Sequence, residues 1–154
     1  MLKLITPVIL TYNEESNIAR VLDSLEWAKD IVVVDSCSTD DTLNIVQCYR
    51  NIRIFQRKFD CHADQWNYAI KETGIEADWI LALDADYVLT NNIVTEIRKL
   101  KPGNSIMGYE ASFSYCILGL ALRGTLYPPV TVLYRREGAS YAQDGHTQRI
   151  LIAD

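Results

Sequence analysis

The sequence lacks the signatures of several common protein classes. Its four cysteines, Cys37, Cys48, Cys61 and Cys116, form no CxxC pair, so their spacing indicates neither a zinc site nor a dithiol redox centre. They are also too few for a disulfide-dense secreted scaffold, which is typical of a protein from a reducing compartment. No GxGxxG, GxxxxGKS/T or GxSxG pattern occurs, and this argues against a classical dinucleotide site, a P-loop NTPase and a hydrolase nucleophile elbow.

Basic residues and long apolar runs are also scarce. The 154 residues include 15 Lys and Arg against 20 Asp and Glu, a net charge of −5, so we expect no nucleic-acid partner. A spanning helix needs about 20 apolar residues, and the longest late apolar run covers only residues 117–122. The N-terminus has too short an apolar run for a signal peptide. We therefore expect a cytoplasmic protein without a transmembrane span, with room for peripheral association at the inner face of the membrane.

The first hundred residues alternate between strand-like apolar runs and helix-like periods. Strands are predicted over residues 7–11, 31–34, 52–55 and 79–83, with helices around residues 18–25, 38–49, 66–70 and 93–100. Ser38, with Asp41 three residues later, has the spacing of a capping box for the second helix. This alternation predicts a mostly parallel sheet between two layers of helices. After Gly103 the pattern changes to strands at residues 107–115, 130–134 and 150–152, which predicts antiparallel or mixed additions within a single domain.

Polar side chains follow three of the predicted strands at the point where each ends. They are Thr11, Tyr12, Asn13 and Glu14 after the first strand, Asp35 after the second, and Asp84 and Asp86 after the fourth. Ligands of open parallel sheets bind at the carboxyl ends of the strands, so these side chains are the candidate site.

The string LALDADY carries the sharpest signal. Residues i and i+2 of an extended chain point the same way, so Asp84 and Asp86 can face one ligand while Ala85 turns into the fold. Two carboxylates suit Mg²⁺ or Mn²⁺ bridging to a diphosphate. The alternative is a solvated loop with an acidic helix cap.

The other strand-end residues each have a structural alternative. Asp35 can accept a hydrogen bond from a base or ribose, or it can bond its own turn. Thr11 and Asn13 can line a ligand pocket or cap the following helix, and Tyr12 can stack on a base or pack.

Two late polar residues are further candidates. His146 can be a metal ligand or touch a phosphate, and Asp144 can be a general base, although Asp144-Gly145 also suits a β-turn. His62, at the start of a helix, is more typical of a structural or exposed residue.

Three ordered strings give the chain a family resemblance. TPVILTYNEESNIARVLDSL at 6–25, IVVVDSCSTDDT at 31–42 and DWILALDADYVLT at 78–90 resemble family-2 glycosyltransferases of the GT-A fold. More narrowly, they resemble the lipopolysaccharide/lipooligosaccharide-core β-glucosyltransferase-like branch. The resemblance implies a Rossmann-like α/β fold with three α/β/α layers, a mostly parallel sheet and C-terminal antiparallel or mixed strands.

The resemblance also implies roles for matching residues. Thr11, Tyr12, Asn13, Glu14, Asp35, Asn67 and Asp84 would bind the nucleotide sugar, Asp86 and His146 would bind Mg²⁺ or Mn²⁺, and Asp84 and Asp144 would be catalytic. Three positions depart from the family pattern. Trp66 stands where Arg or Lys is usual, Cys37 replaces a usual Gly, and Thr147 follows His146 in place of Glu.

The implied reaction moves a sugar, typically from a UDP-hexose, to a hydroxyl of a glycan or lipid-linked acceptor with inversion. Asp144 would take the acceptor proton, with Glu110 as the second candidate. Residues 1–100 would bind the donor and residues 101–154 would begin the acceptor part. Because relatives continue further, the resemblance implies either a minimal form or a truncated chain.

Three other functions fit parts of the sequence. DADYV also matches the motif of haloacid-dehalogenase-like phosphatases, although that motif normally follows the first strand. A phospho-receiver module would share the acidic strand ends but needs a Lys at a late strand end. A non-catalytic nucleotide-sugar-binding module would bind the donor without turnover.

Overall fold

A six-stranded sheet forms the centre of the protein, with strand order β3-β2-β1-β4-β8-β5. The computed structural model describes residues 1–117, 120–122, 128–145 and 147–153. The parallel strands are β1 (Ile5–Thr11), β2 (Ile31–Asp35), β3 (Ile52–Gln56) and β4 (Trp79–Asp84). The strand β8 (Val130–Arg135) runs antiparallel to β4, and β5 (Gly108–Ala111) runs antiparallel to β8. The predicted parallel sheet with antiparallel additions is therefore confirmed.

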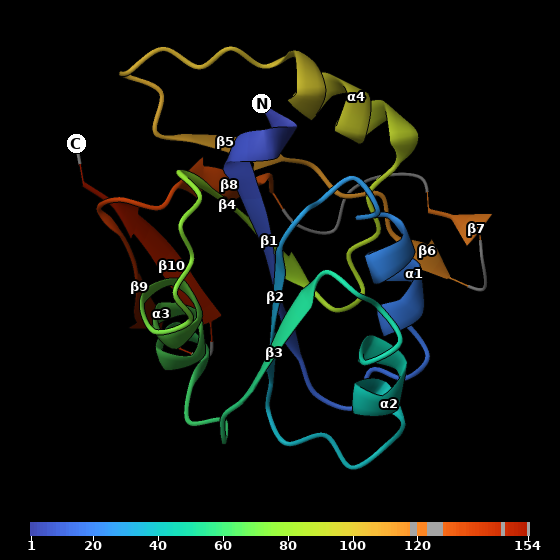
Figure 1. The fold of residues 1–154 in the computed structure, drawn as a ribbon. Helices are drawn as coiled ribbons and strands as arrows, with labels where there is room; N and C mark the ends of the chain where they lie inside the picture. Colours follow the sequence, from blue (N-terminus) through green and yellow to red (C-terminus); the bar gives the residue numbers. More distant parts are fainter. Residues whose placement is uncertain (118–119, 123–127, 146, 154) are drawn as a thin grey trace.

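Helices cover both faces of this sheet (Figure 1). The elements α1 (Ile18–Asp23), α2 (Thr42–Val46) and α4 (Asn91–Lys99) supply one layer, and α3 (His62–Lys71) supplies the other together with the hairpin of β9 (Ala139–Asp144) and β10 (Thr147–Ile152). A 3-10 helix, η1 (Leu2–Leu4), precedes β1, and a short hairpin joins β6 (Cys116–Ile117) to β7 (Leu120–Ala121). None of the helices in the described part of the chain is long and apolar enough to span a membrane.

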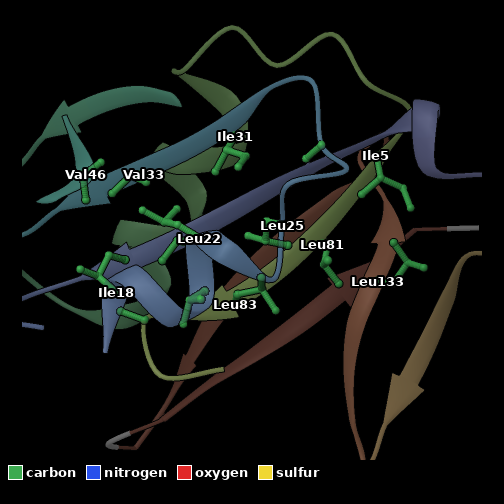
Figure 2. Close-up of a cluster of buried hydrophobic side chains, with 14 of the residues drawn as sticks. Ile5, Ile18, Leu22, Leu25, Ile31, Val33, Val46, Leu81, Leu83 and Leu133 are labelled. Carbon is green, nitrogen blue, oxygen red and sulfur yellow. The ribbon is translucent and has the colours of Figure 1, made fainter. Parts of the chain in front are cut away.

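The apolar strands feed two separate cores because successive side chains point to opposite faces. On β1, Ile9 packs in the core beneath α1 and α2, while Val8 packs in the core beneath α3. Figure 2 shows the first core, where Ile18 and Leu22 of α1 meet Val33 of β2. Both faces are apolar, which explains why these strands read as continuous apolar runs.

One local prediction is wrong, and one strand was not predicted. The helix α2 begins at Thr42 and Ser38 does not cap it; the hydroxyl of Ser38 donates to Asp35, and Asp40 accepts from the Thr42 N–H. Short side chains prefer such local turn bonds when the backbone offers them. The strand β9 was not predicted, because its sequence ASYAQD has few β-branched residues.

Candidate functional site

The polar strand ends meet at one edge of the sheet. The register pairs Asp35 with Thr11 and Asp84 with Leu10, so β2, β1 and β4 end side by side. Neighbouring strands lie about 4.8 Å apart, which puts the α-carbons of Asp35 and Asp84 about 10 Å from one another. The three strand ends therefore lie at one edge of the sheet, as predicted.

The two carboxylates approach this edge from opposite faces. Side chains two residues apart on a strand point to the same face. Asp35 therefore shares the face of Val33, which packs beneath α1 and α2, and Asp84 shares the face of Ala82, which packs beneath α3. A ligand that meets both must lie across the top of β1, between the two helix layers.

Asp84 lies in an acidic and partly desolvated environment. Burial raises the pKa of the Asp84 carboxyl, a hydrogen bond with the Tyr87 hydroxyl partly offsets this, and the charges of Asp86 and Glu14 raise it further. Positive charge on His62 acts in the opposite direction. Residues of the loops after β1 and β4 and of the first turn of α3 therefore act electrostatically on Asp84.

Asp86 reaches this site by a different route from the one predicted. The strand ends at Asp84, and the Tyr87 N–H donates to the Asp84 carbonyl at 3.0 Å, so the chain turns here and does not stay extended. Ala85 is buried as predicted, while Asp86 is exposed and its charge acts on Asp84. The turn brings the two carboxylates together, in place of the i, i+2 alternation.

This site can contribute ligands to a cation. Within the described ranges, no group of three or more His, Cys, Asp or Glu residues is placed to hold a metal ion alone. Mg²⁺ commonly takes one or two carboxylates and completes its shell with water and substrate phosphates. Asp84 and Asp86 could supply one or two carboxylates to a cation held jointly with a diphosphate, with the charge of Glu14 acting on Asp84.

Asp35 is fully buried and holds its own loop. Its carboxylate accepts from the Ser38 N–H at 2.9 Å and the Ser38 hydroxyl at 2.5 Å, and the Gln56 amide donates to it at 3.4 Å. The turn alternative therefore describes its contacts in this structure.

The loops after β1 and β2 are locked together. The Asn13 N–H donates to the Ser38 hydroxyl at 2.9 Å, and the Asn13 side-chain carbonyl accepts from the Thr39 N–H at 2.8 Å. The Glu14 N–H donates to the hydroxyl of Thr42 at 2.8 Å. Neither Thr11 nor Asn13 caps α1, whose N-cap residue is Asn17, so the capping alternative is wrong.

Thr11, the last residue of β1, and Tyr12, which follows it, have side-chain groups that make no polar or ring contact among the described residues. The Thr11 hydroxyl oxygen is buried and has no hydrogen-bond partner among the described atoms. The Tyr12 side chain is 56% exposed, so its ring is open to a planar ligand.

Asn67 and Trp66 face the hairpin, not the edge. The Asn67 amide donates to the Tyr141 carbonyl at 2.8 Å and its oxygen accepts from the Tyr141 N–H at 2.9 Å. Trp66 stacks on the Tyr141 ring at 5.4 Å between centroids. Trp66 thus fills a core position at which Arg or Lys is usual in the family that the sequence resembles.

The remaining candidates lie in the C-terminal part. Asp144 ends β9 beside Gly145, whose φ of +61° matches the Asp-Gly turn alternative. Glu110 is exposed on β5, two strands away from β4. His146 lies outside the described residues.

Two cavities lie at the opposite edge of the sheet. One of about 590 Å³ is lined by residues including Lys29, Asp30 and Arg53, which precede or begin their strands. A second of about 530 Å³ lies between the end of α3 and the β8–β9 turn. Neither cavity is lined by a predicted site residue. The cavities would place a binding site at the amino edge of the sheet, whereas the acidic residues place it at the carboxyl edge. We assign the site by chemistry, because parallel sheets bind ligands at the carboxyl edge.

Comparison with known proteins decides the family. Residues 6–106 match the family model described as glycosyl transferase family 2. The chain belongs to glycosyl transferase family 2. Membership of this family argues against the phosphatase and phospho-receiver alternatives. The DADYV string also lies at the end of β4, whereas the phosphatase motif normally follows the first strand.

The family-2 chain has relatives of known and unknown role. It is 31% identical over 150 residues to an uncharacterised glycosyltransferase of Rickettsia prowazekii (strain Madrid E), covering 92% of this chain and 49% of that protein. It is 29% identical over 137 residues to the lipopolysaccharide core biosynthesis glycosyltransferase LpsC of Rhizobium meliloti (strain 1021), covering 83% and 47%. The chain thus spans about half the length of these curated relatives.

Solved structures share the fold of this family-2 chain. TarS 1-349 of S. aureus in complex with UDP has a TM-score of 0.57 and 27% identity, covering 86% of this chain and 46% of that one. The mannosyltransferase PcManGT from Pyrobaculum calidifontis, in complex with GDP-Man and Mn²⁺, has a TM-score of 0.59 and 21% identity, covering 68% and 34%. The predicted GT-A fold is confirmed.

Sequence reasoning missed three residues of the site. Tyr87 bonds Asp84, His62 lies within its electrostatic reach, and the Asp84 charge acts on Tyr141. The position of Tyr87 directly after DAD was a usable signal. Nothing local to His62 or Tyr141 could have revealed contacts that depend on how α3 and β9 pack.

Proposed function

We propose that the protein binds a nucleotide-diphosphate sugar, typically a UDP-hexose, at the carboxyl edge of β1, β2 and β4. It would transfer the sugar with inversion to a hydroxyl of a glycan or lipid-linked acceptor. The supporting observation is the acidic site around Asp84, which adjoins the locked loops after β1 and β2.

The nucleotide would lie over the loops after β1 and β2. The exposed Tyr12 ring offers a stacking surface, and the unpartnered Thr11 hydroxyl offers a hydrogen bond at the same edge. Asn13 and Glu14 shape this loop through their bonds to the second loop. Because the Asp35 carboxylate is fully buried and bonded to Ser38, contact with the base would require the loop that carries Ser38 to shift on binding.

The diphosphate and sugar would lie near Asp84 and Asp86. A bound Mg²⁺ or Mn²⁺ would neutralise charge that develops on the leaving diphosphate. Asp86 would hold the metal, with Asp84 beside the ribose and sugar and His146 as the further proposed ligand. Asp84 is oriented for this by the Tyr87 hydroxyl, whose own pKa is raised by burial and by Asp84, so it stays a donor at neutral pH.

The acceptor would approach from the side of the β9–β10 hairpin. Asp144 would take the proton from the acceptor hydroxyl as that oxygen attacks the anomeric carbon opposite the nucleotide. In this proposal residues 1–100 bind the donor and residues 101–154 begin the acceptor part.

The named relatives support this proposal in different ways. TarS, 27% identical over its matched region, is solved with UDP, which favours a uridine nucleotide. LpsC acts in lipopolysaccharide core biosynthesis, which favours a lipid-linked glycan as acceptor.

A thermal-shift panel of nucleotide diphosphates, with and without Mn²⁺, tests the proposed function. We expect UDP to raise the Tm only when Mn²⁺ is present, and Asp86→Ala to abolish the shift. Asp41→Ala, which removes an exposed carboxylate after β2, is the matched control and should leave the shift intact. Stabilisation by UDP that needs neither Mn²⁺ nor Asp86 would contradict the proposal.

A further inference from the structure

Asn67 makes a two-way contact with the backbone of β9. Its amide nitrogen donates to the Tyr141 carbonyl at 2.8 Å, and its amide oxygen accepts from the Tyr141 N–H at 2.9 Å. A side-chain amide here occupies the place of a neighbouring strand, because it satisfies both backbone groups of one residue. The edge of β9 is thereby tied to α3.

Two further contacts hold the same hairpin. Trp66 stacks on the Tyr141 ring with an interplanar angle of 18°, and the Tyr141 hydroxyl donates to the hydroxyl of Tyr134 at 3.1 Å. At the other end of β9, the Ala63 N–H in the first turn of α3 donates to the Gln143 side chain at 3.2 Å. The hairpin is therefore docked along α3 from Tyr141 to Gln143, and β9 lies beside α3 (Figure 1).

The docked hairpin runs toward the proposed donor site. The Asp84 charge acts on Tyr141, so this part of β9 passes near the acidic cluster. Gln143 contacts the residue after His62, and His62 lies within electrostatic reach of Asp84. Asp144 follows Gln143 directly, so the contacts of α3 determine where Asp144 lies.

The same bonds argue against Asn67 as a nucleotide ligand. Both groups of its amide are already used, and leaving a partly buried amide or carbonyl unpaired costs about 1–3 kcal/mol. A ligand that recruited this amide would have to break its contacts with Tyr141. No such cost applies to Tyr12 or Thr11, whose ring and hydroxyl are unengaged among the described residues.

We propose that Asn67 is a positioning residue, which docks the β9–β10 hairpin on α3 and thereby sets the position of Asp144 beside the donor site. The role of Asp144 rests on the proposed function, whereas the docking role of Asn67 does not. Asn67 would thus act on the acceptor side of the reaction without touching the nucleotide.

Hydrogen exchange and UDP affinity of Asn67→Ala test this proposal together. Loss of two hydrogen bonds should speed amide exchange in residues 139–145 and 147–152 by about tenfold or more, with protection of β1 to β4 unchanged. UDP affinity, measured by calorimetry with Mn²⁺, should stay within about twofold of the wild type. Asn44→Ala is the control, because its exposed amide bonds only Asp41 on α2 and should change neither quantity.

Sugar transfer gives a readout that a purely structural contact would not move. With Asn67→Ala, kcat should fall about tenfold or more while the KM for the nucleotide sugar stays within about twofold. Asn67→Asp is the second variant if the alanine protein does not fold. It keeps an acceptor for the Tyr141 N–H but no donor for its carbonyl, so the hairpin should still exchange faster.

Two results would overturn the proposal. One is unchanged hairpin exchange in both Asn67 variants, and the other is a loss of UDP affinity beyond about tenfold, with or without hairpin opening. If the wild-type protein itself binds no UDP, the proposed function fails, and the exchange arm alone still decides whether Asn67 docks the hairpin.

Discussion

At the scale of single residues, Cys37 carries backbone strain at a turn beside the site. Its φ of +65° lies in the left-handed region, which favours glycine because other residues bring their Cβ too close to the backbone. The family resemblance has Gly at this position. The replacement therefore costs stability in the loop that Asp35 holds.

Cys37→Gly should raise the stability of the protein. Relief of the strain should exceed the cost of the extra chain entropy of glycine and leave a gain of about 0.5–1 kcal/mol, or about 1–4 °C in Tm. Thermal unfolding checks this. Cys48→Gly is the control, because Cys48 is exposed without a positive φ and glycine there should be neutral or destabilising.

The ionised Asp84 carboxylate should lower the stability of the folded protein. Burial raises the folded-state pKa of Asp84 above its unfolded value. Its favourable contribution is therefore present below the unfolded pKa and is lost as the pH rises through the folded pKa. At pH 7 the ionised carboxylate disfavours folding.

Asp84→Asn should therefore raise the Tm at pH 7, by roughly 2 °C or more, and the gain should shrink as the pH falls through the raised folded-state pKa of Asp84. Asp30→Asn is the matched comparison. Hydrogen bonding to Arg53 lowers the pKa of Asp30, so its contribution is present above the unfolded pKa and is lost as the pH falls through the folded pKa. Asp30→Asn should lower the Tm at pH 7. A loss of Tm in both variants would contradict the account.

At the scale of elements, the loops after β1 and β2 behave as one unit. The fully buried Thr42 hydroxyl accepts from the Glu14 N–H at 2.8 Å and donates to Asp40 at 2.6 Å, so it bridges the two loops from the first turn of α2.

Thr42→Val keeps the shape of the side chain and removes both bonds. We expect a loss of about 1–3 kcal/mol in the free energy of unfolding, because the partly buried Glu14 N–H loses its partner. UDP affinity should also fall, although Thr42 is not a proposed ligand. Thr95→Val on α4, where the exposed hydroxyl bonds only the Asn91 carbonyl, should change denaturant unfolding by less than about 0.5 kcal/mol. Equal losses in the two variants would refute the bridging role.

The sequence predicted these elements well wherever one apolar period dominates. The runs that became β1, β2 and β4 are apolar on both faces, and the stripe of Ile93 and Ile97 marked α4. The strand β9 was missed because its stability comes from β10 and from α3, through contacts such as Asn67 with Tyr141. Tertiary contacts of this kind leave no local period in the sequence.

The site was predictable to a similar extent. The rule that ligands bind at strand ends located Asp35, Asp84 and Asp86 at one edge. It could not reveal the turn at Asp84. Nor could it reveal that the carboxylates of Asp35 and Asp84 approach the edge from opposite faces of the sheet, because both features depend on where each strand stops. The role of Asn67 also depended on packing, since its partner lies 74 positions away in the chain.

At the scale of the whole molecule, the two edges of the sheet differ in chemistry. At the amino edge, Arg53 and Asp30 pair through two bonds of 2.7 and 2.8 Å, and the Thr6 hydroxyl donates to Asp30. At the carboxyl edge, the negative charges of Asp86 and Glu14 act unfavourably on the Asp84 carboxylate. The first edge pairs Asp30 with a cation of the chain itself, whereas the second gathers like charges around Asp84, where the proposed cation would bind.

Broadening of backbone amide signals by Mn²⁺ in the presence of UDP tests this division most directly. In an NMR titration, the account predicts that the amides of Glu14, His62, Asp84 and Asp86 broaden first. Those of Asp30, Arg53 and Gly138, at the amino edge, should stay sharp. Broadening centred on the amino edge, or spread evenly over the surface, would contradict the claim that the ends of β1, β2 and β4 form one metal-assisted donor site.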